Sequence, residues 1–148
     1  MTVALATALN ISPAVAVSLE RWHDMIAKRD FTGLLAMTRP DVIFRSPAMH
    51  KPYHTAPVLH LILSTVMGVF QDFAYHREFA SEDGLSVVLE FSARVGEREL
   101  KGIDMIRFDA EGKIAEFEVM IRPLSGLQAL AAEMGTRIGA VLAGGKPT

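Results

Sequence analysis

One carboxylic acid interrupts an apolar strand face in this sequence. In the strand expected over 99–109, Asp104 shares its parity with three apolar residues, Leu100, Ile106 and Phe108, so its side chain should point to the core. An ionised, unpaired carboxylate costs several kcal/mol there, so we expect a raised pKa or a bonding partner. Two interpretations stay open: an acid or hydrogen-bond donor in a pocket, or a structural Asp satisfied by a buried aromatic donor.

The second group of candidates is histidine, which titrates near neutral pH. His50 and His54 lie in the Pro- and His-rich segment 46–55, and His60 follows on the next predicted helix. A histidine beside a pocket could act as a general base, although most histidines in such positions are solvated loop or helix residues. His50 and His54 could also bind a metal, but the spacing suggests no third ligand, so we expect neither a metal nor a cofactor.

Length, composition and charge exclude several classes of function. The 148 residues fit a single domain, 1–148, and the absence of Cys excludes disulfides, a thiolate nucleophile and a Cys-based zinc site. A net charge of -2 gives no reason to expect a nucleic-acid partner. No apolar run reaches the roughly 18 residues that span a membrane, and segment 1–11 lacks the basic region of a signal peptide. We therefore expect a cytoplasmic protein with no membrane contact.

The elements that must position these residues follow from periodicity, helical at first and then strand-like. The predicted α+β domain has its core at about 13–123, followed by a C-terminal helix over 124–143. The helices and strands expected before that helix are a helix from Ser12-Pro13, a short helix between Asp30 and Pro40, a strand over 41–45, a helix over 56–70 and four antiparallel strands over 72–122. This order suggests a cone, in which the curved sheet wraps around the N-terminal helices and leaves a cavity.

Two stretches carry a resemblance to a known family. The first runs from Arg21-Trp22 through Asp30 to Ser46-Pro47, and the second is the strand-turn-strand segment 103–114. With them the chain resembles the nuclear transport factor 2-like (NTF2-like, SnoaL-like) superfamily and, locally, bacterial ketosteroid isomerases. The resemblance implies a cystatin-like roll around a small-molecule pocket.

The isomerase roles transfer only in part. The general base falls on Ser46, whose hydroxyl cannot abstract a proton at neutral pH, and the oxyanion-hole tyrosine falls on Trp22, which offers an indole N–H instead of a phenol. Only the oxyanion-hole acid is kept, as Asp104; ketosteroid isomerases hold the Asp in that role neutral by means of an apolar site. The resemblance thus implies a pocket protein for a small apolar molecule that is not a true ketosteroid isomerase.

Two functions are compatible with these residues. One is proton-transfer chemistry, such as isomerisation, cyclisation or dehydration of an apolar carbonyl compound, with Asp104 as acid and His50 or His54 as base. The other is a non-catalytic ligand-binding or protein-interaction module on the same fold. The residues expected to line the pocket are Trp22, Ser46, His60, Tyr75 and Phe91.

The outer sheet face also carries apolar residues, which are expected to be covered. They are Val88, Ile103, Met105, Ile114 and Met120. The sequence favours a homodimer through this face, with the C-terminal helix of the same chain as the alternative cover.

Overall fold

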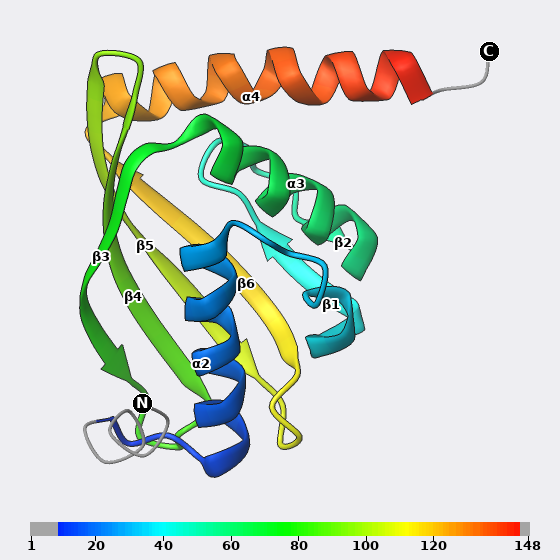
Figure 1. Cartoon of the computed structure of the whole chain (residues 1–148), viewed down its shortest axis with the longest axis vertical. Helices are drawn as coiled ribbons and strands as arrows, with labels where there is room; N and C mark the ends of the chain where they lie inside the picture. Colours follow the sequence, from blue (N-terminus) through cyan, green and yellow to red (C-terminus); the bar gives the residue numbers. More distant parts are fainter. Residues whose placement is uncertain (1–8, 146–148) are drawn as a thin grey trace.

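The computed structural model describes residues 9–145, with side chains as far as residue 139. Helices pack inside a curved sheet, and a long helix crosses one end (Figure 1), which confirms the predicted α+β class. The elements are α2 (Pro13–Lys28), η1 (Leu35–Met37), β1 (Thr38–Arg45), β2 (Tyr53–His54), α3 (Ala56–Val69), β3 (Gln71–Ala80), β4 (Ser86–Val95), β5 (Arg98–Phe108), β6 (Ile114–Arg122) and α4 (Leu124–Gly145). No helix in the described range is long and apolar enough to cross a membrane.

Helix α2 begins where the sequence predicted. The Ser12 hydroxyl caps it by accepting from the Val15 backbone N–H at 3.2 Å, and Pro13 occupies its first turn, a position that needs no backbone donor. Its last residue, Lys28, is followed by Arg29 in the left-handed conformation. Between these two ends, Trp22 is buried and packs against Phe117 of the sheet.

The predicted second helix is wrong. Only the 3-10 turn η1 forms, because so short a segment gains too few hydrogen bonds to repay helix nucleation. Strand β1 then starts at Thr38 and includes Pro40, which was expected to precede the strand. Pairing of β1 with β6 is irregular between Thr38 and Ile43, so the missing N–H of Pro40 falls in a stretch without a regular ladder.

The sheet order is β2-β1-β6-β5-β4-β3. Strands β3 to β6 form the predicted antiparallel meander. The sequence did not predict that β1 adds to β6 in parallel, nor that β2 pairs with β1. The sheet is therefore mixed, and the loop between β1 and β2, after Arg45, contributes to the cavity on the inner face.

Irregular register changes which side chains face the core. A shift between Arg107 and Phe108 sets Ile114 opposite Phe108, and Ile114 is fully buried. The prediction that Ile114 points to the outer face is therefore wrong, because a bulge locally reverses which side chains of the strand face inward and outward.

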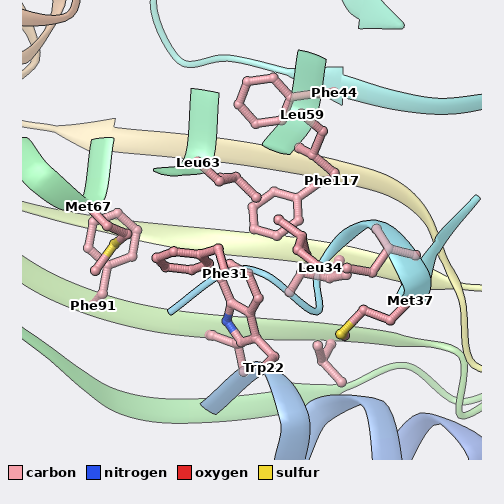
Figure 2. Close-up of a cluster of buried hydrophobic side chains, with 14 of the residues drawn as sticks. Trp22, Phe31, Leu34, Met37, Phe44, Leu59, Leu63, Met67, Phe91 and Phe117 are labelled. Carbon is pink, nitrogen blue, oxygen red and sulfur yellow. The ribbon is translucent and has the colours of Figure 1, made fainter. Parts of the chain in front are cut away.

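The core lies between the inner sheet face and the first two long helices (Figure 2). Trp22 from α2 packs edge-on against Phe117 of β6, with ring centroids 5.5 Å apart. Leu59, Leu63 and Met67 form the buried stripe of α3 above this aromatic layer. Most of the apolar surface therefore lies on the concave side of the sheet.

Helix α4 packs on the inner side of the sheet end. A Cβ at Gly126 would lie 2.8 Å from the Leu100 side chain, which itself points inward. The alternative that α4 covers the outer sheet face is therefore wrong. Of the four remaining outer-face residues, Val88, Ile103 and Met105 are partly exposed and Met120 is exposed.

Candidate functional site

A cavity of about 540 Å³ opens between the inner sheet face, α3 and α4. This volume is typical of small-molecule sites, which bury most of a ligand in a largely apolar lining with few polar groups. The lining is apolar almost throughout. Its side chains with a polar or titratable atom are Trp22, Ser46, Tyr53, Tyr75 and Asp104.

Three of these side chains form one hydrogen-bonded network. The Trp22 Nε1–H donates to the Tyr75 hydroxyl at 2.9 Å, and that hydroxyl donates to Asp104 Oδ2 at 2.5 Å. The residues come from α2, β3 and β5, so the network joins one helix to two strands. Phe91 of β4, which also lines the cavity, stacks on Phe73 at 5.2 Å and closes the wall between those strands.

Burial controls the protonation of this network. It raises the pKa of Asp104 to about 7, because an apolar environment penalises the carboxylate and the Tyr75 hydrogen bond compensates only in part. The pKa of Tyr75 is raised well above its ordinary value, mainly by burial and secondarily by the nearby Asp104. Near neutral pH the acid is therefore accessible in both forms, while Tyr75 remains a phenol.

Asp104 has one oxygen left for a ligand. Oδ2 accepts from Tyr75, and no other hydrogen bond within residues 9–139 reaches either oxygen. The donors of Trp22 and Tyr75 are both used inside the network. A neutral Asp104 is thus the donor that this end of the cavity can offer to a carbonyl oxygen.

Ser46 lines the cavity but closes a turn. Its hydroxyl oxygen accepts from the backbone N–H groups of Ala48 and Met49, at 3.1 Å each. Serine favours such local bonds where a strand ends. The position of the isomerase base therefore holds a residue that stabilises the loop and cannot take up a proton.

The three candidate histidines lie outside the cavity lining. His50 and His54 are exposed, whereas their neighbours Met49 and Tyr53 are the lining residues of that loop. His60 is turned to the other side of α3, where Nε2 lies 3.1 Å from the Phe31 carbonyl oxygen beside a separate pocket of about 330 Å³. Helical geometry places Val58, Leu61 and Ile62 toward the main cavity instead of His60.

Several lining residues were missed by the sequence analysis as site residues. Leu127, Ala131, Met134 and Ile138 of α4 form one wall. Their helical spacing is visible in the sequence, but a stripe that covers a cavity has the same pattern as one that packs in a solid core. Within the described residues, no cluster of three or more His, Asp or Glu side chains could hold a metal ion.

Comparisons with known proteins agree with this geometry. The SnoaL-like domain model matches residues 19–117, more than half of the chain. A solved structure of a steroid delta-isomerase from Pseudomonas aeruginosa is 62% identical to the chain, with a TM-score of 0.89 over 91% of this chain and 98% of that one. An uncharacterized protein conserved in bacteria, with a cystatin-like fold, from Silicibacter pomeroyi is 30% identical, with a TM-score of 0.78 over 85% and 89% of the two chains.

A more distant structure shares the fold alone. It is an epoxide hydrolase/cyclase-like enzyme of pyran ring formation in the polyether salinomycin, 14% identical, with a TM-score of 0.60 over 72% of this chain and 89% of that one. A search of curated proteins gave no match. The domain match and the two nearer structures place the sequence with one group: the chain belongs to the SnoaL-like family, on the NTF2-like fold.

Proposed function

We propose that the chain binds a small apolar carbonyl compound in the cavity and exchanges a proton with it through Asp104. One observation carries the proposal: the apolar cavity has on its wall a single carboxyl, and the pKa of that carboxyl is raised to about 7. Groups whose pKa lies near the working pH are the efficient proton donors and acceptors. The apolar lining favours a ligand with few polar groups.

The proposed step is a proton donation from Asp104 to the carbonyl oxygen. The O–H on Oδ1 would bond that oxygen, polarise the carbonyl and make hydrogens on the adjacent carbon more acidic, and a solvent water molecule that enters the cavity would take the hydrogen that leaves this carbon. The carboxylate formed by transfer keeps the Tyr75 hydrogen bond, which is itself supported by Trp22. Isomerisation, cyclisation and dehydration of carbonyl compounds can all begin in this way.

The experiment that tests the proposal is hydrogen exchange on a bound ketone. In heavy water, the wild-type protein should speed deuterium uptake beside the carbonyl of an apolar ketone, followed by NMR. Asp104→Asn keeps the size of the side chain and a donor but has no exchangeable acid proton, so it should lose most of the acceleration. Equal exchange rates for the two proteins would contradict proton transfer by Asp104.

Binding without turnover is the second candidate. It is favoured by the lining, which contains no titratable side chain apart from Tyr53, Tyr75 and Asp104, so a second group acting as base is missing from the described cavity. In that case, the ketone would bind to both proteins, and neither would accelerate the exchange.

We also propose that the protein is not a true ketosteroid isomerase. The similarity to a protein named steroid delta-isomerase supports a polycyclic apolar ligand, but the Ser46 hydroxyl accepts two backbone bonds and is not a base. Purified protein should show no appreciable conversion of a β,γ-unsaturated steroid ketone to its α,β-unsaturated isomer, assayed by ultraviolet absorbance. Ser46→Asp alone should not restore it fully, because Trp22 still replaces the phenol; wild-type turnover comparable to that of a true isomerase would contradict this.

A further inference from the structure

A bulge in β3 places Glu78 on the inner face of the sheet. Tyr75 pairs with Phe91 and Glu78 with Leu89, so the two residues between them oppose the single Glu90. Regular alternation would point Tyr75 and Glu78 to opposite faces. With the extra residue, both side chains are partly buried on the concave side, while the intervening residues are exposed. Bulges of this kind re-aim side chains near functional sites.

The re-aimed Glu78 meets His23 on α2. His23 Nε2 and Glu78 Oε1 lie 2.6 Å apart, and the two side chains are only 29% and 21% exposed. His23 directly follows Trp22 in the chain, and its ring lies edge-on to Tyr75 with centroids 5.3 Å apart. The His23–Glu78 pair is therefore adjacent to the Trp22–Tyr75 hydrogen bond, and neither of its residues lines the cavity.

These two contacts hold α2 against β3. Among residues 9–139, the hydrogen bonds from α2 to β3 are Trp22 to Tyr75 and His23 to Glu78. The first has the geometry that orients the network: a hydroxyl has one hydrogen and two lone pairs. With the indole N–H on one lone pair, the hydrogen of Tyr75 is directed to Asp104.

We propose that His23 and Glu78 are positioning residues for the cavity, and that their pairing keeps Trp22 on Tyr75 so that Tyr75 donates to Asp104. The inference rests on the function proposed above for this cavity. Without the pair, α2 can move away from β3. Tyr75 then loses the donor that polarises its hydroxyl, and its hydrogen bond no longer holds Asp104 in the position where that side chain meets a ligand.

The pair differs from an ordinary surface ion pair, which contributes little. Lys28 and Asp24 form such a pair on the same helix, with side chains 68% and 60% exposed. It joins residues of one helix, whereas His23–Glu78 joins two elements beside the network. Glu20, one turn before His23 on α2, makes no hydrogen bond to β3 within residues 9–139, and its Oε2 atom is buried there without a hydrogen-bond partner.

The test uses Trp22, the only tryptophan of the chain, as a fluorescent probe of its own contact. Glu78→Ala removes the pair, whereas Glu78→Gln keeps a neutral hydrogen bond to His23. Asp24→Asn is the matched control, because it removes an acidic charge from the residue that directly follows His23 in α2. Each protein is examined by Trp22 emission, by acrylamide quenching and by its affinity for a naphthol, whose hydroxyl would bind at Asp104.

Glu78→Ala should shift the emission to the red, increase quenching and weaken naphthol binding roughly tenfold, about the effect of one lost hydrogen bond. Glu78→Gln should stay near wild type, and Asp24→Asn should match wild type. Either unchanged emission or unchanged affinity in Glu78→Ala would overturn the positioning role, even if its melting temperature fell. If that variant fails to fold, His23→Ala removes the same contact, and its emission and naphthol affinity test the positioning role in the same way.

The proposed function and the positioning role fail separately. Wild-type protein that binds no naphthol would contradict the function proposed for the cavity. Emission that is unchanged in Glu78→Ala would contradict the positioning role, whether or not naphthol binds.

Discussion

Asp104 gives the free energy of unfolding a pH dependence that can be measured without knowing the ligand. Burial raises its folded pKa to about 7, from an ordinary value of 3.8. Below the ordinary value the side chain is neutral in both states and its stabilising contribution is full. As pH rises through the folded value, the contribution is lost, on the order of a few kcal/mol in total.

Asp104→Asn should therefore remove this pH dependence. The Asn oxygen can still accept from Tyr75, so we expect the variant to fold. Its free energy of unfolding should rise relative to that of the wild-type protein between about pH 4 and pH 8. Urea unfolding at both ends of this range measures the difference. Glu90, whose pKa is lowered by hydrogen bonds to Arg77 and Lys101, has the opposite dependence at lower pH and is common to both proteins. Parallel stability curves would show that the Asp104 pKa is ordinary.

At this scale the sequence identifies the acid but not its partners. The parity of Asp104 with Leu100 and Ile106 is sufficient to predict burial, because strand alternation is a local property. That Tyr75 accepts from Trp22 and donates to Asp104 depends on how three separate elements pack. The histidines were misleading for the same reason: His50 and His54 are close to lining residues in the chain, yet both are exposed.

At the scale of elements, α4 is anchored at its start. A Cβ at Gly126 would lie 2.8 Å from Leu100 Cβ and 2.9 Å from the Glu99 carbonyl oxygen, whereas one at Gly139 would meet nothing within 4 Å. Gly126→Ala should therefore destabilise the protein by about 1–3 kcal/mol and loosen the α4 wall of the cavity. Gly139→Ala, the matched control, should stabilise by up to about 1 kcal/mol, because Ala is the better helix former. Thermal unfolding of both variants tests this, and equal shifts would contradict the anchor.

Elements with a strong local pattern could be predicted, and those defined by distant partners could not. Alternating residues identify β4 and β5, and the Ser12-Pro13 cap identifies the start of α2. The two-residue strand β2 and the parallel pairing of β1 with β6 depend on residues far apart in the chain. The bulge at Glu78 has no local signal either, so the face to which Glu78 points was hidden in the sequence.

At the scale of the whole molecule, the two faces of the sheet differ in what covers them. The concave face is divided between a packed core under α2 and the cavity beneath α3 and α4. The convex face carries an apolar patch in which Val88 pairs with Met105 and Ile103 with Met120, and which Glu90, opposite Ile103, and Glu118, opposite Met105, border on the same face. Nothing among residues 9–139 covers Met120, which is 45% exposed.

Such a patch on a sheet face is expected to be buried by a second copy of the chain, since a two-fold interface brings the same patch together from both subunits. Light scattering should then report about twice the chain mass of 16.2 kDa. Met105→Glu should shift the protein toward monomer or aggregate, because it places a charge near the middle of the patch. Leu35→Glu, at a residue 45% exposed on η1, is the control and should leave the mass unchanged. A wild-type monomer across a wide concentration range would mean that the convex face stays open to solvent.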